Sequence, residues 1–579
     1  MTRRSHRQPS VRSHPRFVYI LPFAMILVAG AIILWPSITS QAQGGQPSPW
    51  IAGVVRDGQG QPVQGAQVSL LSSPESQPLT EAATQADGRY ALVLSEPIPN
   101  MPIVQIERAH FKPTQIDITT LQVQTLRSGE TVILPDVTLK RSITAAFWIA
   151  TLVFVSVLVL IATGVLHNTL STLVGAAVLF LISYLGHPIS ENFFIFDFAG
   201  AIHYIDWNVI FLVMGMMIVI AVVENTGIFQ WLAFFAYRVS GGRTWLLLPI
   251  LMLITGVASA FLDNVTTMLL MTPISVQIAI SLGINPLALL IPEVLASNVI
   301  GVSTLVGTPT NILIGSYANI SFNDFLKNLT PGVLLAFIGL LLYCAFIYRR
   351  ELAKASEASP LLLEKLAERG RITNPGNLKK AGVVGFGMLL MFVFGEIVHL
   401  LPAVTALIGA TALMVWIRPN IEEMIEAVDW TTLVFFMSLF IVVGAIQEVG
   451  LISFIADGIG KLVGEHLLLT MLVIIWLSAL LSTVVANIPF TAAMLPVVGY
   501  LSATVPGANS KVLFYCLSVG SAMGGNGSLI GASANMVTAG IADSAGYPIT
   551  YAYFLKKGFP ALLITVGLAT LWLLYRFFM

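Results

Sequence analysis

Asp206-Trp207 opens one long apolar stretch of the chain, and Asp429-Trp430 opens another 223 positions later. The same offset of 223 relates Asn264 to Asn487 and Pro273 to Pro496. An offset of 224 relates Gly307-Thr308-Pro309-Thr310-Asn311 to Gly531-Ala532-Ser533-Ala534-Asn535. Matching Gly, Pro and Asn interruptions in two hydrophobic halves are typical of secondary transporters, whose substrate site lies near the middle of the membrane.

The composition is that of a membrane protein. Hydrophobic residues make up 56% of the 579 positions, charged residues make up 10%, and the mean hydropathy is +0.84. Such a chain must keep most of its length in lipid. The formal net charge is zero, so nothing indicates a nucleic-acid partner. The two cysteines, Cys344 and Cys516, lie in apolar stretches and favour neither a disulfide framework nor a cysteine-based metal site.

Residues 1–42 have the pattern of an export signal. Residues 1–16 carry five arginines and no acid, and Phe17–Trp35 is an uncharged run long enough to cross a bilayer. Ser40-Gln41-Ala42 fits a cleavage site, so a cleaved signal peptide and a retained signal anchor both remain open. Either one predicts that the next segment lies outside the cytoplasm, in a protein of the inner (cytoplasmic) membrane.

Residues 50–140 change to short β-branched runs between turn residues. We expect strands at Ile51–Arg56, Ala66–Leu71, Tyr90–Leu94 and Ile103–Glu107, with turns at Asp57-Gly58, Gln61-Pro62 and Asp87-Gly88. The motifs Gly53-Val54-Val55-Arg56-Asp57 and Ala86-Asp87-Gly88-Arg89-Tyr90 resemble those of the carboxypeptidase regulatory-like β-sandwich. This resemblance implies a small extracytoplasmic accessory domain and indicates no ligand.

From Ile143 onward the sequence predicts a polytopic α-helical membrane protein with two repeats, at 143–348 and 381–579. The first repeat has apolar segments at 143–165, 169–186, 207–223, 245–282, 290–318 and 331–348, and the second at 381–399, 401–417, 430–447, 467–503, 512–543 and 560–578. We expect the bipartite segments 245–282 and 467–503 to be re-entrant hairpins, which leaves about five spans in each repeat. Because five is odd, the second repeat should be inverted relative to the first.

The distribution of charge supports this topology. With residues 1–16 inside, the predicted cytoplasmic segments hold Arg238, Arg243, Arg418, Lys556, Lys557 and the eight basic residues of the linker 349–380. The predicted outer loops hold only Lys327, Lys461 and Lys511. This asymmetry satisfies the positive-inside rule. The linker 349–380 is therefore expected to be cytoplasmic.

Polar residues interrupt the apolar segments at both hairpin turns and again within 301–311 and 524–535. A bilayer core tolerates non-helical backbone only where it is buried in protein or lines a wet cavity. We therefore place the substrate and ion site at these interruptions. The candidate residues are Asp263, Asn264, Thr266, Thr267, Asn298, Gly307, Thr308, Asn311, Asn487, Thr491, Asn526, Ser528, Gly531, Ser533 and Asn535.

Two kinds of group in this set suit ion coupling. Asn264, Thr308, Asn487 and Ser533 offer hard oxygens that suit sodium, whereas Asp263 is an ionisable group at a hairpin tip. Glu293 has no acidic counterpart in the second repeat, and both a site role and a role at the cytoplasmic end remain open for it. No Lys or Arg occurs between Arg243 and Lys327, so an anion would be held by dipoles, hydroxyls, amides and bound cations. No cofactor is expected apart from sodium or a proton as the coupling ion.

Two segments carry a resemblance to a known family. Residues 259–268, Ser-Ala-Phe-Leu-Asp-Asn-Val-Thr-Thr-Met, and 524–535, Gly-Gly-Asn-Gly-Ser-Leu-Ile-Gly-Ala-Ser-Ala-Asn, are similar to signature segments of the ion transporter superfamily. They most resemble its branch of arsenite pumps, sodium/proton antiporters and the P protein, with divalent-anion/sodium symporters as more distant relatives. The resemblance covers 143–579 and implies hairpin tips and broken helices that meet at the site, commonly in a homodimer.

The chain also departs from that branch. Ala486 and Thr308 stand where its members usually have Asp. We expect a secondary transporter, not an enzyme, that moves a small inorganic ion or anion on a sodium or proton gradient. The alternative is sodium-coupled symport of a di- or tricarboxylate or another oxyanion. An alternative of another class is a membrane-anchored sensor that uses the outer β-domain.

Overall fold

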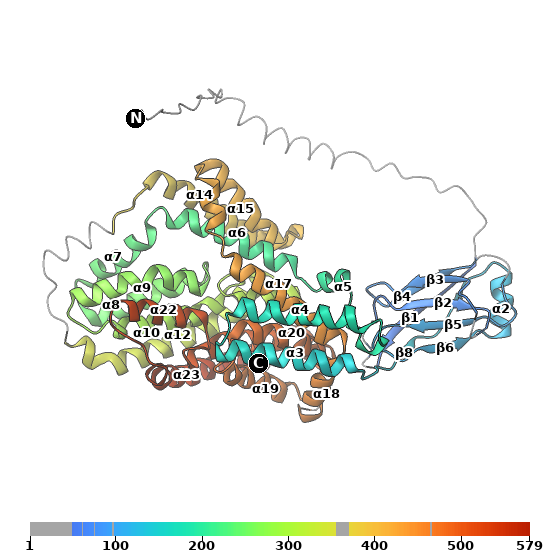
Figure 1. The fold of residues 1–579 in the computed structure, drawn as a ribbon. Helices are drawn as coiled ribbons and strands as arrows, with labels where there is room; N and C mark the ends of the chain where they lie inside the picture. Colours follow the sequence, from blue (N-terminus) through green and yellow to red (C-terminus); the bar gives the residue numbers. More distant parts are fainter. Residues whose placement is uncertain are drawn as a thin grey trace, which may run out of the picture. The chain divides into compact units, whose positions relative to one another are not determined.

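The structure, a computed structural model, describes residues 49–578 except 59, 61, 74–75, 95–97, 355–369 and 464–465 (Figure 1). The expected signal segment 1–42 and residues 355–369 of the linker lie outside the described residues, so the predictions for them stay predictions. The chain divides into two compact units. One is a β unit that runs to Glu107 and resumes at Pro113–Leu139, and the other is a helical unit of Arg108–Lys112 and Lys140 onward.

The β unit consists of two sheets. Alternating burial along β1 and β5 buries Ile51, Val55, Val104 and Ile106, which is the period-2 pattern of strands with one buried face. One sheet has the order β4-β1-β7 with β8 also paired to β1, and the other has the order β3-β2-β5-β6. The strands are β1 Trp50–Asp57, β2 Gln67–Leu71, β3 Thr80–Ala83, β4 Arg89–Val93, β5 Ile103–Glu107, β6 Thr114–Asp117, β7 Val132–Ile133 and β8 Val137–Leu139, and helix α2 is Thr120–Arg127.

The four predicted strands correspond to β1, β2, β4 and β5. The predictions missed β3, β6, β7, β8 and α2. The missed strands are two to four residues long, and β3 and β6 have no fully buried residue. Strands this short and exposed give little alternation to detect, which is why the sequence pattern did not show them.

The helical unit holds two sets of helices in the same order. The first set is α3 Ala145–Thr163, α4 Asn168–Gly186, α5 Phe198–His203, α6 Trp207–Glu224, α7 Ile228–Ser240, α8 Thr244–Ser259, α9 Asn264–Ser281, α10 Leu287–Ile300, α11 Pro309–Ala318 and α12 Phe322–Leu352. The second set is α14 Pro375–Phe394, α15 Pro402–Ile417, α16 Ile421–Glu426, α17 Trp430–Glu448, α18 Leu451–Val463, α19 Leu467–Leu481, α20 Asn487–Thr504, α21 Val512–Gly524, α22 Ser533–Ser544 and α23 Tyr551–Phe578.

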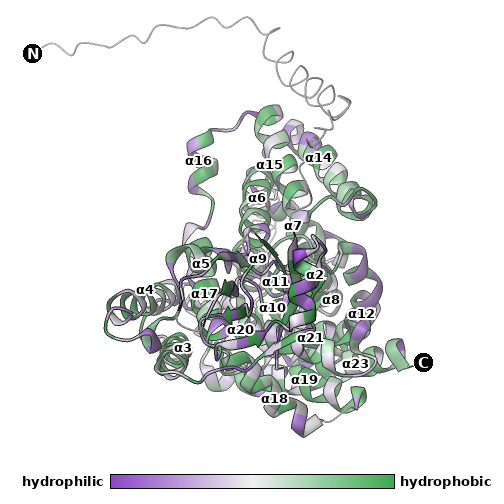
Figure 2. Cartoon of the chain, turned by 90° about the vertical axis from the view of Figure 1, so that its right-hand side faces the viewer, coloured by the Kyte–Doolittle hydropathy of each residue, from purple (hydrophilic) through white to green (hydrophobic). Residues whose placement is uncertain are grey.

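Within the described residues, eight helices are long and apolar enough to cross a bilayer, and four shorter apolar helices accompany them. Figure 2 colours most of these helices as hydrophobic. On α3, large apolar side chains such as Trp148 and Leu152 are exposed, which suits contact with lipid. The chain is a multi-pass membrane protein.

The conserved spacing between the repeats extends to the short helices. Helices α16, α17, α18, α19 and α20 each begin 223 positions after α5, α6, α7, α8 and α9. Asp206 and Asp429 are the N-caps of α6 and α17, because their carboxylates accept backbone N–H groups of the first turn. The predictions missed α7 and α18, although the same offset would have paired them.

Packing between the repeats is reciprocal. Helix α4 of the first repeat packs against α17 of the second, and α15, the counterpart of α4, packs against α6, the counterpart of α17. The hairpin helices follow the same rule, since α9 packs on α22 and α20 packs on α11. This exchange is what a two-fold relation between the two repeats produces. It agrees with the predicted fold class, a polytopic helical membrane protein built from two repeats.

Candidate functional site

The two hairpin turns begin their second helices at equivalent asparagines. Asp263 is the N-cap of α9, and its Oδ1 accepts the backbone N–H groups of Val265 at 2.9 Å and Thr266 at 3.0 Å. The Thr266 hydroxyl donates to Asp263 Oδ2. In the second repeat Ala486 occupies the cap position without a side-chain hydrogen bond. The Asp263 carboxylate is thus engaged by the first turn of its own helix.

A hydroxyl ties each hairpin to the broken helix of the same repeat. Thr304 Oγ1 donates to the Ala260 carbonyl and accepts the Gly307 N–H at 3.0 Å. Ser528 Oγ donates to the Thr483 carbonyl and accepts the Gly531 N–H at 3.1 Å. The sequence prediction included Ser528 and missed Thr304, although the 224-position offset relates the two.

Asparagine side chains satisfy carbonyls in both helix breaks. Asn311 Nδ2 donates to the Val302 carbonyl at 2.9 Å and to the Thr304 carbonyl at 2.7 Å. Asn535 Nδ2 donates to the Gly525 carbonyl at 2.8 Å and to the Ser528 carbonyl at 2.9 Å. The breaks separate α10 from α11 and α21 from α22, where a helix cannot supply its own donors. Each asparagine therefore holds an unwound loop in shape.

A network of buried asparagines crosses from one repeat to the other. Asn264 Nδ2 donates to Asn298 Oδ1 at 2.8 Å, and Asn298 Nδ2 donates to Asn526 Oδ1 at 2.9 Å and to Asn535 Oδ1 at 3.0 Å. Asn298, Asn526 and Asn535 are fully buried, and Asn264 is 7% exposed. We call these four residues the asparagine network. It brings together a hairpin tip and helix α10 of the first repeat with the broken helix of the second.

Further hydroxyls extend this network. Ser259 Oγ donates to Asn264 Oδ1 at 3.0 Å and accepts from Ser297 Oγ at 2.9 Å. A second link between the repeats runs from Ser518 Oγ to Asn311 Oδ1 at 2.6 Å. None of these serines is among the predicted site residues. Ser259 and Ser297 carried a signal in the sequence, because they pair with Ser482 and Ser521 at the repeat offset, whereas Ser518 pairs with Val294.

Asn487 does not join the asparagine network. Its backbone N–H donates to the Gly531 carbonyl at 3.3 Å, and its own carbonyl accepts the Thr491 hydroxyl at 2.7 Å. Its side chain is nearly buried, at 6% exposure, and makes no hydrogen bond within the described residues. Its partner in the predicted sodium set, Ser533, is exposed.

The other predicted residues of the first repeat lie close to the network. Thr308 is the N-cap of α11, where its hydroxyl accepts the Asn311 N–H at 3.3 Å and contacts the Thr310 hydroxyl. A Cβ on Gly301 would lie 2.9 Å from Asn264 Oδ1 and 3.0 Å from Thr308 Cγ2, so these two residues flank the same glycine, with the Thr308 methyl group toward it. Thr267 is buried, and its hydroxyl has no partner within the described residues.

Gly307 and Gly531 allow backbones to meet. A Cβ on Gly307 would lie 2.4 Å from the Gly301 carbonyl oxygen and 2.8 Å from the Ser259 carbonyl oxygen. A Cβ on Gly531 would meet the Gly525 and Ser482 carbonyl oxygens at 2.8 and 2.9 Å. Only glycine permits this approach of a break to its hairpin.

The network itself carries no charge, since its four members are amides, and the Asp263 carboxylate lies next to Asn264 at the hairpin tip. Across the described residues, no group of three or more His, Cys, Asp or Glu could hold a metal ion. The nearest carboxyl along α10 is Glu293, which is fully buried. Its Oε2 accepts the hydroxyls of Thr255 at 3.1 Å and Ser275 at 2.9 Å.

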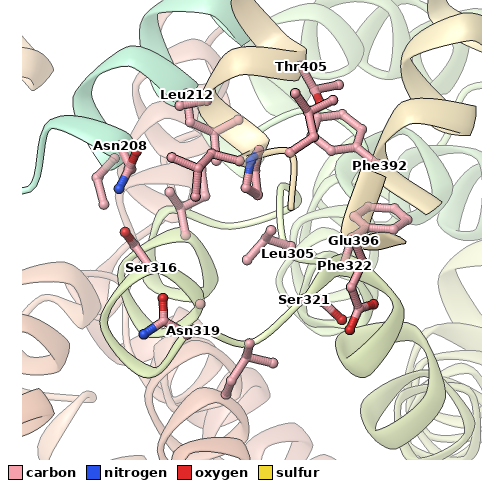
Figure 3. A pocket seen from close by; sticks show the side chains of 18 of the residues that line it. Asn208, Leu212, Leu305, Ser316, Asn319, Ser321, Phe322, Phe392, Glu396 and Thr405 are labelled. Carbon is pink, nitrogen blue, oxygen red and sulfur yellow. The ribbon is translucent and has the colours of Figure 1, made fainter. Parts of the chain in front are cut away.

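Two cavities lie at opposite ends of α6. One, of about 270 Å³, is lined by α6, α11 and the start of α12 from the first repeat and by α14 and α15 from the second (Figure 3). Asn208 at the beginning of α6 and Leu305 from the helix break face it, with Glu396 at its rim. The other, of about 330 Å³, is lined by Glu224 at the end of α6, Gln230 and residues of α9. No residue of the asparagine network lines either cavity.

Comparisons with known proteins agree with this architecture. Residues 157–509 match the family model described as citrate transporter. An uncharacterized transporter from Mycobacterium tuberculosis is 36% identical over 431 residues, which cover 74% of this chain and 98% of the relative. The human P protein is 31% identical over 513 residues, which cover 75% of this chain and 60% of that protein.

One solved structure also aligns with the chain. The YdaH transporter from Alcanivorax borkumensis aligns with a TM-score of 0.49 and 16% identity, over 75% of this chain and 98% of the other.

Proposed function

This chain belongs to the citrate transporter family, and from that premise we propose that it is a secondary active transporter of a small inorganic ion or anion, coupled to a sodium or proton gradient. The observation that carries the proposal is the asparagine network, which joins the hairpin tip of one inverted repeat to the broken helix of the other. A substrate bound beside such a network contacts both repeats at once. Relative movement of the repeats can then expose it to either side.

The two cavities support alternating access. Asn208 and Glu224 lie at the two ends of the 18-residue helix α6, which spans about 27 Å at 1.5 Å per residue. Because Leu212 also lines the first cavity, about 18 Å of α6 separates the two cavities, and each reaches inward toward a hairpin or a helix break. In this proposal they are the two access routes, and the broken helices between them are the gate.

The chemistry of the site favours a small ion. Neutral amides and hydroxyls can coordinate a cation through oxygen or an anion through N–H, but they supply no formal charge. We place a coupling sodium beside Asn264 and Thr308, which flank Gly301, and a second near Asn487 and Ser533.

The second candidate is symport of a di- or tricarboxylate. The matching family model is described as a citrate transporter, and this description supports a carboxylate substrate here. A carboxylate would need its charge balanced by co-bound cations, because Lys and Arg do not occur in the sequence between Arg243 and Lys327. We also propose a homodimer in the inner membrane, with the β unit outside and the linker 349–380 inside.

A flux screen in proteoliposomes tests the proposal. Purified protein is reconstituted, and uptake of labelled sodium, arsenite, chloride, sulfate, phosphate, citrate and succinate is measured under separate sodium and proton gradients. We expect one substrate class to accumulate against its gradient in the wild type. Asn298→Ala vesicles serve as the matched control. Absence of gradient-driven uptake for every probe would contradict secondary transport, and accumulation of citrate or succinate alone would select the second candidate.

A further inference from the structure

Glu293 is a carboxyl group sealed inside the helical unit. It lies on α10 with no exposed surface, and its Oε2 accepts hydrogen bonds from Thr255 on α8 and Ser275 on α9. Its other oxygen, Oε1, is buried and has no hydrogen-bond partner in the described parts of the chain. A buried carboxylate oxygen without a hydrogen-bond donor is unfavourable, and binding of a proton or a cation to it would remove that cost.

Nothing nearby balances a negative charge on this group. Helices α8 and α9, which hold the two hydroxyls, carry no charged residue. Four other helices that pack on α10 carry titratable residues. These are Asp324, Lys327, Tyr343, Cys344, Tyr348, Arg349, Arg350 and Glu351 on α12, Tyr515 and Cys516 on α21, Asp543 on α22, and Tyr551, Tyr553, Lys556, Lys557, Tyr575 and Arg576 on α23. Within the described residues, none of them forms an ion pair or hydrogen bond with Glu293. An isolated carboxylate at this depth is costly, whereas a neutral carboxylic acid is not.

A ladder of polar contacts leads from Glu293 to the asparagine network. Thr255 and Ser259 are four residues apart on α8, and Glu293 and Ser297 are four residues apart on α10, so each pair lies on one helix face. Thr255 contacts Glu293 at 3.1 Å, and one turn further Ser259 contacts Ser297 at 2.9 Å. Ser259 then donates to Asn264. Glu293 is therefore connected to Asn264 of the proposed substrate site through two successive pairs of side chains on α8 and α10.

The second repeat keeps hydroxyls equivalent to Thr255, Ser259 and Ser297 but lacks the carboxyl and the hydroxyl of Ser275. At the repeat offset, Thr255 corresponds to Ser478, Ser275 to Val498 and Glu293 to Leu517. The Ser478 hydroxyl is buried and has no partner within the described residues, because a leucine stands where its acceptor would be. The carboxyl of Glu293 and the Ser275 hydroxyl that it accepts thus distinguish the first repeat from the second.

We propose that Glu293 is the proton-binding site of the transport cycle. The carboxyl carries a proton while it is enclosed between α8, α9 and α10, releases it as H⁺ when movement of the hairpin admits water, and takes up another proton from the opposite side. Thr255 and Ser275 are positioning residues that hold the carboxyl through Oε2. This inference rests on the proposed transport function and adds the proton as the coupling ion.

The first test needs no substrate. Infrared spectra of the purified protein in lipid are recorded at pH 7 for the wild type and for Glu293→Gln, which keeps the size and hydrogen-bonding capacity of the side chain. We expect the wild type to show the carbonyl stretching band of a protonated carboxyl and Glu293→Gln to lack it. An identical band in both proteins would overturn the proposal.

The second test measures coupling in proteoliposomes that contain the pH dye pyranine, with the substrate found in the flux screen. We expect the wild type to move protons with substrate. Glu293→Gln should lose at least about tenfold of the proton flux while retaining substrate exchange with no gradient applied. Ser478→Ala in the second repeat is the matched control and should move protons within twofold of the wild type.

Each remaining outcome has a distinct meaning. Substrate flux in the wild type without proton movement, or proton flux unchanged in Glu293→Gln, would overturn the proton site and leave the proposed transport function standing. A wild type that moves no probe would overturn the proposed function, and the infrared band would then decide protonation of Glu293 by itself. Shifts in the pH midpoint of flux in Thr255→Val and Ser275→Ala would support their positioning role, and unchanged midpoints would contradict it.

Discussion

Asn298 is the residue of the proposed site that forms hydrogen bonds with both repeats. Its Oδ1 accepts from Asn264 of the hairpin tip, and its Nδ2 donates to Asn526 and Asn535 of the opposite repeat. An amide suits this position because it accepts and donates at once without adding charge, which a carboxylate or an ammonium group cannot do. Asn298 also directly follows Ser297, whose hydroxyl contacts Ser259 in the polar contacts that lead from Glu293 to the network.

Substitution of Asn298 by alanine should therefore stop transport. The change leaves Asn264 Nδ2 and the Asn526 and Asn535 oxygens with fewer partners in a buried site, at a cost of about 1–3 kcal/mol. We expect initial flux to fall at least tenfold, with a lower unfolding temperature in detergent. Flux assays and thermal melts measure both effects. Asn192→Ala, in the short exposed 3-10 helix Glu191–Phe193, is the control. Wild-type flux in Asn298→Ala would contradict a central role for the network.

Asp263 shows how a carboxylate at a hairpin tip can serve a helix. Because its Oδ1 caps α9, Asp263→Asn should keep the cap, and Asp263→Ala should lose about 1 kcal/mol of stability. We expect Asp263→Asn to retain gradient-driven flux within a few-fold of the wild type, measured with and without sodium. Loss of sodium dependence in Asp263→Asn with an unchanged melting temperature would instead assign its charge to ion coupling, as its sequence position suggests.

At the scale of elements, the broken helices are positioned by close backbone contact. Gly307 and Gly531 let each break lie against the end of its hairpin, and Thr304 and Ser528 join the two segments by side-chain hydrogen bonds. Gly, hydroxyl and Asn thus act together at each break. The glycine gives the approach, the hydroxyl ties the hairpin, and the asparagine satisfies the free carbonyls.

Alanine at either of these glycines should displace the break. A Cβ at Gly307 would overlap the Gly301 carbonyl oxygen, and backbone cannot yield as the tip of a flexible side chain does. Overpacking of this kind costs about 1–3 kcal/mol. We expect Gly307→Ala and Gly531→Ala to lose most flux and to melt at lower temperature. Gly567→Ala in α23, where a Cβ meets nothing within 4 Å, should be neutral or slightly stabilising. Equal behaviour of all three variants would refute the close-packing argument.

At the scale of the whole molecule, reciprocal packing of α4 on α17 and α15 on α6 makes the two repeats a single helical unit. Inverted repeats can adopt two equivalent arrangements in which their conformations are exchanged, one open to each side of the membrane. In the proposed cycle, Glu293 gives the first repeat a proton-dependent step that the second repeat lacks. The coupling proton would then bind in the first repeat only, although the two repeats have nearly the same fold.

Cysteine labelling tests the orientation. Cys344 and Cys516 are buried, so the native cysteines should react little with a membrane-impermeant maleimide. We expect Glu191→Cys, in an exposed predicted outer loop, to be labelled in intact cells, and Arg371→Cys, in the exposed part of the linker, to be labelled only after the membrane is opened. Labelling of Arg371→Cys in intact cells would break the proposed placement of the linker inside.

The sequence by itself determined the transporter fold. The 223-position repeat, the apolar segments and the breaks at Asn264, Asn487, Gly307 and Gly531 predicted the two inverted repeats and the hairpins, because membrane spans depend on local hydrophobicity and turn chemistry. Helices α7 and α18 escaped prediction because they are 13-residue amphipathic helices and not continuous apolar runs long enough to span a bilayer. The missed strands of the β unit are too short to show an alternating pattern. The positions of Asn298, Asn311, Asn526 and Asn535 as site candidates also came from the sequence.

The tertiary structure alone decided which of these groups meet. It separated Asn487 and Ser533 from the asparagine network, assigned Asp263 to a helix cap, and placed Thr304, Ser259 and Ser297 beside the predicted residues. It also set Glu293 against Thr255 and Ser275 with one oxygen unpaired. These contacts join residues up to 237 positions apart, and they depend on helix rotation and on packing across the repeats, which spacing along the chain does not specify.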